Sequence, residues 1–169
     1  MLMRKFLSFI VCMILSLFCF AACDPGFNDI DAEETIANTV KIELVDYKNE
    51  NPKLLKLKKE EKPKFDFSKA TLIATLDDSQ FENIINDMSK ILLLMYPRAL
   101  NEPIGKTIIL YQQNGDMIVL YDSVYTNNKG NVFYYSGCTK FDKNGVFIEY
   151  LGDIGSDLFN SLLSTYFNQ

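Results

Sequence analysis

The chain has 169 residues, the size of one domain, and carries 22 acidic against 17 basic residues for a net charge of −5. A nucleic-acid-binding protein would show a basic field, so the charge argues against that class. The sequence contains no histidine, which excludes serine–histidine–aspartate and cysteine–histidine catalytic groups and the usual zinc sites.

The first 23 residues have the layout of a secretory signal. Arg4 and Lys5 form a short positive region, residues 6–22 carry no charge, and Cys23 follows two alanines. The apolar run is slightly shorter than the ~20 residues of a comfortable transmembrane helix, which favours a cleaved signal over a permanent span. An uncleaved membrane anchor is the alternative.

The end of this segment, Phe20-Ala21-Ala22-Cys23, resembles the lipobox of bacterial lipoproteins, in which a bulky apolar residue and two small residues precede a cysteine. Phe20 stands where that family usually has leucine. The resemblance implies that Cys23 receives a diacylglycerol and becomes the N-terminus after residues 1–22 are removed as a signal peptide. It also implies attachment to the outer face of the bacterial cytoplasmic membrane, since two acyl chains hold a protein stably.

Loss of residues 1–22 from the 169 would leave 147 residues, with 15 basic and 22 acidic side chains. With Cys23 lipidated, Cys138 would be the one free thiol, and no intrachain disulfide could form. Stability must then come from a hydrophobic core. Cys138 lies in a predicted strand, where a small buried residue is favoured over a reactive or partner-pairing thiol.

Residues 23–38 are predicted to be an acidic tether that leads into a single domain over 39–169. Five acidic residues, no basic residue and only weak periodicity occur over 24–38. Fifteen extended residues reach about 50 Å. One helical turn over 33–37 is the alternative.

The first half of the domain contains two predicted strands around a lysine-rich stretch. Apolar and polar residues alternate over 39–47, the period of a half-buried strand. Six lysines between Lys53 and Lys64 predict a solvated loop or irregular helix, with a basic patch for lipid headgroups or wall polymers as the functional alternative. The second strand is predicted within 65–76 and is best defined over 71–76.

A helix is predicted from Ser79 to about Met95. Asp77 and Asp78 precede it, the residue type that caps a helix and suits its dipole. Apolar residues from 81 to 92 then recur at helical spacing and form one stripe, which predicts a helix packed on the core. Pro97 would end the helix.

The second half is predicted to be four strands joined by tight turns. Asn114-Gly115 is a strong hairpin signal, because a type I′ turn needs positive φ at both positions. Closure between Gln113 and Asp116 would place Tyr111 opposite Ile118. The predicted strands are 105–113, 116–125, 131–141 and 146–151.

The last turn and the C-terminal helix complete the domain. Asp142 and Asn144 faintly resemble calcium ligands, but the glycine arrives two positions early for an EF-hand loop and no glutamate stands at its last position. A hairpin turn is predicted there instead. Ser156 is predicted to cap a final helix whose apolar stripe docks on the sheet.

The predicted element order is therefore β-β-α-β-β-β-β-α, an α+β fold in which both helices pack on one face of an antiparallel β-meander. Tight turns between the last four strands exclude parallel crossovers there. No cofactor or metal site is predicted.

Two sets of side chains are candidates for a site. Carboxylates for acid–base chemistry would be Asp77, Asp78, Asp116, Asp122 and Glu149, although each also fits a cap, a turn or an exposed strand. Tyrosines gather in the second half of the sheet and could form an interaction platform, or could cover the edge of the core with their hydroxyls in water, which the pattern favours. They are Tyr111, Tyr121, Tyr125, Tyr134, Tyr135 and Tyr150.

The sequence thus predicts a membrane-tethered lipoprotein outside the cytoplasm, with a non-catalytic domain that binds an envelope protein or polymer and no nucleic acid. A carboxylate-dependent hydrolase of the cell envelope is the alternative, and a purely structural envelope component is a third. An enzyme would need a concave pocket where two carboxylates converge, whereas a binding protein needs only an exposed apolar patch.

Overall fold

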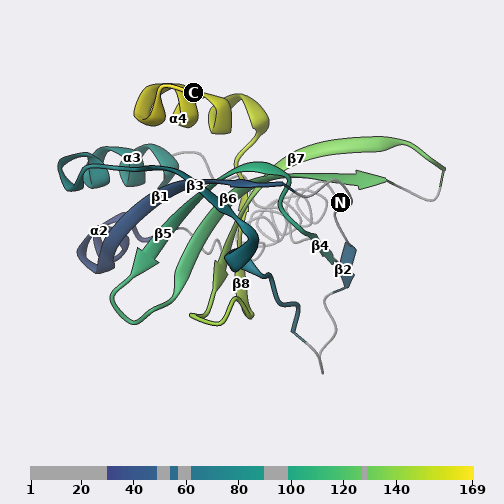
Figure 1. The fold of residues 1–169 in the computed structure, drawn as a ribbon, viewed down its shortest axis with the longest axis horizontal. Coiled ribbons are helices and arrows are strands. Elements are labelled where there is room, and N and C mark those ends of the chain that lie inside the picture. The colour runs from purple at the N-terminus through teal and green to yellow at the C-terminus, as the bar shows by residue number, and fades with distance from the viewer. Residues whose placement is uncertain (1–29, 49–53, 57–61, 90–98, 127–128) are drawn as a thin grey trace, which may run out of the picture.

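The computed structural model describes residues 30–48, 54–56, 62–89, 99–126 and 129–169. It shows an α+β fold in which three helices accompany a six-stranded antiparallel sheet of order β3-β1-β5-β6-β7-β8 (Figure 1). The strands of this sheet are β1 (Thr39–Tyr47), β3 (Thr71–Thr75), β5 (Gly105–Gln112), β6 (Met117–Thr126), β7 (Val132–Phe141) and β8 (Phe147–Asp153). The helices are α2 (Ala32–Asn38), α3 (Phe81–Ser89) and α4 (Ser156–Phe167), with 3-10 turns η1 (Phe67–Lys69) and η2 (Asp78–Gln80). A separate pair joins β2 (Leu54–Lys56) to β4 (Ala99–Asn101).

The predicted α+β fold class is confirmed, because the helices pack on the sheet. Apolar side chains of α3 and α4 meet those of the central strands in one core. The meander comprises β5 to β8, whereas β1 lies between β3 and β5. Both of these neighbours are antiparallel to β1, so β3 and β5 are parallel to each other, with α3 in the crossover between them.

The core on that face is built from the predicted helical stripes. Ile84, Ile85 and Met88 of α3 are fully buried. Phe159 and Leu162 of α4 are at most 2% exposed. Burial of each such side chain contributes about 1.5–3 kcal/mol relative to leaving it exposed. Residues 90–98, which hold the predicted end of the first helix and Pro97, lie outside the described residues.

A second core lies on the opposite face of the sheet, under a segment that we call the strap, residues 63–70. Phe65 of the strap is 1% exposed and stacks on Phe141 with 4.7 Å between ring centroids. Backbone hydrogen bonds fix the strap to the start of β8, from Phe65 N to Gly145 O (2.9 Å) and from Phe147 N to Pro63 O (2.8 Å). Residues 65–70 thus belong to the strap, and the strand predicted within 65–76 is β3, over 71–75, which matches the part predicted as best defined.

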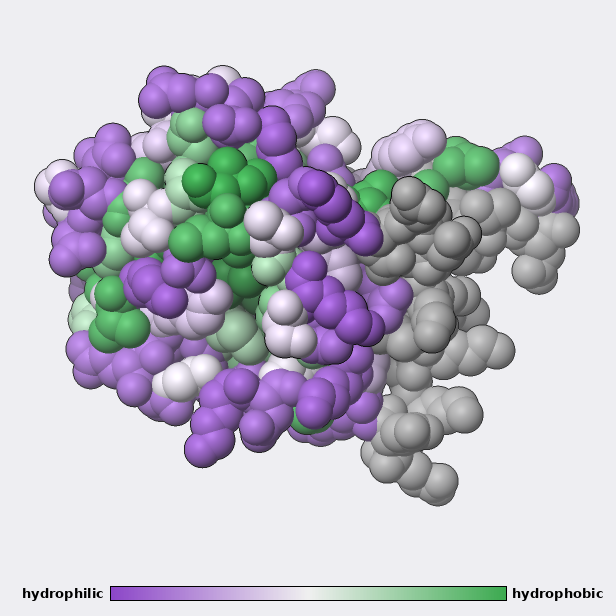
Figure 2. Space-filling view, in the orientation of Figure 1, coloured by the Kyte–Doolittle hydropathy of each residue, from purple (hydrophilic) through white to green (hydrophobic). Residues whose placement is uncertain are grey.

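The outer edge of the sheet at β3 exposes apolar side chains. Leu72 and Ile73 are 55% and 40% exposed, and Figure 2 shows hydrophobic surface where β3 lies in Figure 1. The strand is only five residues long, and its pairing with β1 contains a register shift. Short and irregular edge strands discourage pairing with another chain.

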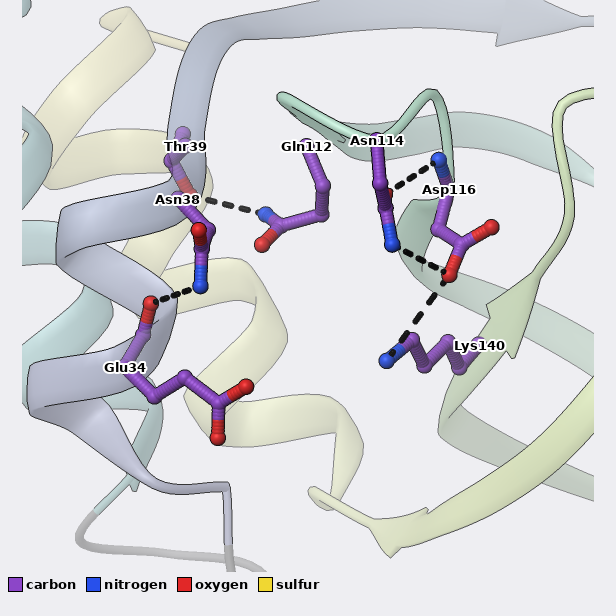
Figure 3. Close-up of polar contacts among 7 residues, drawn as sticks. All are labelled: Glu34, Asn38, Thr39, Gln112, Asn114, Asp116 and Lys140. Carbon is purple, nitrogen blue, oxygen red and sulfur yellow. Dashed lines mark hydrogen bonds and ion pairs between the residues drawn. The ribbon is translucent and has the colours of Figure 1, made fainter.

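Helix α2 occupies part of the segment predicted as a tether. Asp31 caps it by accepting a hydrogen bond from Glu34 N (3.0 Å), and Ile30 just before it is buried in the core. Its C-terminal end docks on the β5–β6 turn, where Gln112 Nε2 donates to Thr39 Oγ1 (2.9 Å; Figure 3). Residues 32–38 are therefore helical, as the alternative of a helical turn over 33–37 expected, and this part of the predicted tether is wrong.

The β5–β6 turn is a three-residue loop and not the predicted type I′ turn. Gly115 has φ +89°, but Asn114 does not have positive φ, and type I′ requires it at both positions. Gln112 N donates to Asp116 O (2.8 Å), so these two residues close the turn. A hydrogen bond within the loop also stabilises the turn, because Asn114 Oδ1 accepts from Asp116 N (2.8 Å; Figure 3).

This turn shifts the register between β5 and β6 by one residue. Tyr111 pairs with Met117, and not with Ile118 as predicted. Because side chains alternate along a strand, a one-residue shift exchanges the two faces of β6. Ile118 and Leu120 therefore face the helices, while Met117 lies under the strap.

The remaining predictions concern the ends of the chain. The turn at 142–145 is formed as predicted, and Asp142 Oδ1 accepts from Asn144 N and Val146 N, both at 2.8 Å. Gly155 caps α4, and Ser156 is its first residue, although it was predicted to be the cap. Residues 1–29, and residues 53 and 57–61 of the lysine-rich stretch, lie outside the described residues.

Candidate functional site

A cleft of about 1,000 Å³ lies between α4 and the strands β5 to β7. It exists because the β6–β7 hairpin is longer than its neighbours: β6 pairs with β5 as far as Tyr121, and β7 pairs with β8 from Gly137. The outer part of the hairpin, residues 122–126 and 132–136, forms an arm that extends beyond the sheet (Figure 1). The outline of the molecule is indented between α4 and this arm (Figure 2).

The cleft is lined by the sheet on one side and by the polar face of α4 on the other. The sheet contributes Lys106 from β5, Asp122 from β6 and Tyr134 from β7. Helix α4 and the residues after it contribute Ser156, Asn160, Ser161, Ser164 and Gln169. Leu163, Ile104 and Gly105 complete the lining.

Asp122 is the carboxylate of the cleft. It is partly buried, and this burial raises the pKa of its carboxyl group, an effect that the hydrogen bond from Ser136 opposes. The Ser136 hydroxyl donates to Asp122 Oδ1 and lies 3.3 Å from the hydroxyl of Ser156 at the start of α4. This chain of contacts connects Asp122, at the base of the arm, to the start of α4.

The other predicted carboxylates lie outside the cleft. Asp77 caps η2 and accepts at Oδ1 from Ser79 Oγ (2.6 Å) and from Ser79 N (2.9 Å), and these two hydrogen bonds lower the pKa of its carboxyl group. Asp116 belongs to the β5–β6 turn, with 3.9 Å between its Oδ2 and Lys140 Nζ. Asp78 lies in η2 and Glu149 in β8.

None of the other predicted carboxylates therefore lines the cleft with Asp122. Asp122 is the only Asp or Glu side chain among the described residues that line the cleft. Cysteine, aspartate and glutamate do not gather in the described ranges into any group of three that could hold a metal ion.

Three of the six tyrosines are buried or partly buried in a core and do not form an open face. Tyr121 and Tyr150 are 0% and 5% exposed and belong to the core under the strap. Tyr111 is partly buried beside that core, with Lys41 Nζ 4.2 Å from its ring centroid. These three tyrosines pack against a core and not on an open platform, because the strap, which the sequence did not reveal as a second layer, covers that face of the sheet.

Tyr134 is the exception, since its side chain is 74% exposed and lines the cleft. Tyr135 is partly buried. Tyr125 lies in β6, and its side chain is outside the described part of the chain. Two predicted residues, Asp122 and Tyr134, thus meet in one site although they were predicted for different reasons.

Sequence reasoning missed the rest of the lining. The α4 residues Asn160, Ser161 and Ser164 form the polar side of an amphipathic helix, a pattern that ordinarily marks a solvated face. The spacing of polar residues is the same for a helix face in open solvent and for one that lines a cleft, so the sequence pattern does not separate the two. Lys106 and Gln169 are likewise ordinary polar residues in the sequence.

Cys138 is fully buried among the apolar side chains between the sheet and the helices. Burial raises the pKa of its thiol, so the nucleophilic thiolate is disfavoured. This placement agrees with the favoured prediction of a small core residue.

Among the residues that the structure describes, no helix has the length and apolar character needed to cross a membrane. Comparisons of the chain with protein families, with curated proteins and with solved structures gave no significant match.

Proposed function

We propose that the protein is a bacterial lipoprotein whose single domain binds a ligand outside the cytoplasmic membrane without catalysing a reaction. The observation that carries the proposal is the cleft between α4 and the arm, where Asp122 and the exposed Tyr134 come together. Ligand sites are usually concave, and polar groups at fixed positions in them orient the ligand.

The anchor in this proposal is Cys23, at the end of the lipobox-like Phe20-Ala21-Ala22-Cys23. Because Ile30 is already buried in the domain, the chain from Cys23 to Ile30 could span at most about 25 Å. The domain would therefore stay close to the membrane. Helix α2 lies at the end of the molecule remote from the arm (Figure 1), so a tether this short would leave the arm directed away from the bilayer.

The hydrolase alternative receives less support from this site. Carboxylate-dependent hydrolysis of a glycosidic bond uses two carboxyl groups, one as acid and the other as base or nucleophile. Within the described lining of the cleft, Asp122 stands without a second carboxylate. A binding role needs no such pair.

Fatty-acid labelling in growing cells tests the anchor. We expect wild type and Cys19→Ala to incorporate radiolabelled fatty acid, and Cys23→Ala to lose the label. Cys19 is the matched control because it lies in the same apolar segment without preceding alanines. If Cys23→Ala is labelled like the wild type, or if no form is labelled, the anchor proposal is wrong.

Photo-crosslinking in intact cells tests the cleft. A photoreactive amino acid replaces Asn160, which lines the cleft, or Val40, which is 54% exposed on β1. We expect an adduct from position 160 that position 40 does not give. Equal adducts from both positions, or none from position 160, would contradict binding through the cleft.

A further inference from the structure

We infer that the cleft between α4 and the arm binds a neutral oligosaccharide, with the Tyr134 ring as the surface on which a sugar unit stacks. The inference rests on the proposed function, because it names the ligand class of the same cleft. Two properties of the cleft support it: the chemistry of the side chains in its lining and the exposure of Tyr134.

The polar lining is dominated by groups that both donate and accept hydrogen bonds. Ser161 presents a hydroxyl, and Asn160 and Gln169 present side-chain amides. Each such group can pair with a sugar hydroxyl, which also donates and accepts, whichever way the two are oriented. A phosphorylated or strongly acidic ligand would call for several cations, but Lys106 is the one basic side chain in the described lining.

Tyr134 supplies the apolar part of the site. Tyr134 is 74% exposed and lines the cleft, on the same strand face as Ser136, which contacts Ser156 of α4. The C–H face of a pyranose ring is flat and apolar, so stacking on Tyr134 would remove both surfaces from water. The phenol hydroxyl can remain solvated or bind a neighbouring sugar hydroxyl.

Asp122 supplies the strongest acceptor. Ser136 already binds its Oδ1, and we assign its Oδ2 to a sugar hydroxyl. A hydrogen bond to an ionised carboxylate is roughly twice as strong as one between neutral groups. The partial burial of Asp122 strengthens such a bond further, because the local dielectric is lower than in water.

A protein partner fits the cleft less well. Serine, aspartate and lysine are depleted in the centres of protein–protein interfaces, yet the described lining includes Ser156, Ser161, Ser164, Asp122 and Lys106. The volume of about 1,000 Å³ lies at the upper end of the ~300–1,000 Å³ typical of small-molecule sites. That volume suits a short chain of sugar units.

Calorimetric titration of the full-length chain in detergent tests the inference with two neutral tetrasaccharides. Chitotetraose represents the β-linked N-acetylated sugars of cell walls, and maltotetraose represents α-linked glucans. We expect one of them to bind, which also identifies the source. Tyr134→Ala should weaken that binding about tenfold or more, whereas Tyr134→Phe, which keeps the ring, should change it less than about threefold.

Val132→Ala is the matched control, since Val132 is 51% exposed on the same strand and does not line the cleft. Its affinity should equal that of the wild type. The inference is overturned if neither sugar binds at millimolar concentration, or if Tyr134→Ala binds like the wild type. If neither sugar binds but the crosslinker at position 160 captures a protein, the sugar assignment is wrong and the cleft is still a binding site. If position 160 gives no adduct at all, the proposed function itself is wrong.

Discussion

Gly145→Ala tests the attachment of the strap to the sheet. Gly145 ends the turn before β8 with φ +77°, and its carbonyl accepts a hydrogen bond from Phe65 N (2.9 Å). A Cβ added at Gly145 would lie 2.1 Å from Phe65 O, far inside any van der Waals contact. The strap must therefore move away from the turn.

The expected loss of stability has two parts. An alanine held at positive φ costs about 1–2 kcal/mol. Displacing the strap also breaks the backbone hydrogen bonds of Phe65 and Phe147, each contributing about 1 kcal/mol. The sum is about 3–4 kcal/mol, and it grows if Phe65 leaves its buried position, since truncating a buried phenylalanine costs about 3–5 kcal/mol. This is a large part of the 5–15 kcal/mol of a typical domain.

Urea unfolding followed by circular dichroism gives the free energy of unfolding of each variant. Gly130→Ala is the matched control, because Gly130 has φ +80° but an added Cβ would meet nothing within 4 Å. Gly130→Ala should lose only about 1–2 kcal/mol. If the free energy of unfolding falls by the same amount in both variants, Phe65 O does not lie as close to Gly145 as described, and the reasoning is refuted.

Three further predictions follow from buried groups. Cys138 should resist iodoacetamide in the native protein and react in urea, as peptide mass mapping can show, because it is fully buried; native alkylation would contradict this placement. The pKa of Asp122 is raised above 3.8 in the folded state, so the wild type should gain stability relative to Asp122→Asn as the pH falls from 7 toward 4; a difference in urea unfolding that does not vary with pH would count against it. Tyr121→Phe should lose about 1 kcal/mol in the same assay, since the Tyr121 hydroxyl lies 3.3 Å from Thr139 Oγ1 in the core; an unchanged free energy of unfolding would show that this contact is not stabilising.

The elements that the sequence predicted well are those that carry their own periodic pattern. Strand β1 matches the predicted 39–47, and both helical stripes face the core. Such patterns report which side of an element is buried, because hydrophobic spacing follows the geometry of the helix or strand itself. The predicted fold class followed from their order.

The site was predictable only in part. Asp122 and Tyr134 were both candidates, but nothing in the sequence indicated that they meet. Their meeting depends on the length of the β6–β7 hairpin relative to its neighbours and on where α4 docks. Both are consequences of strand pairing between residues far apart in the chain.

By itself, then, the sequence determined the α+β fold class, the alternation of most strands and the lipobox-like end at Cys23. Tertiary structure alone decided the docking of α2, the strap over the second face and the register of β6. The physical reason is that each of the latter depends on contacts without a local signature. For example, the backbone N of Gln113 donates to Asn38 O (2.8 Å), a residue far away in the sequence. Asn114-Gly115 alone would favour a type I′ turn, but the turn that makes this long-range hydrogen bond is a three-residue loop.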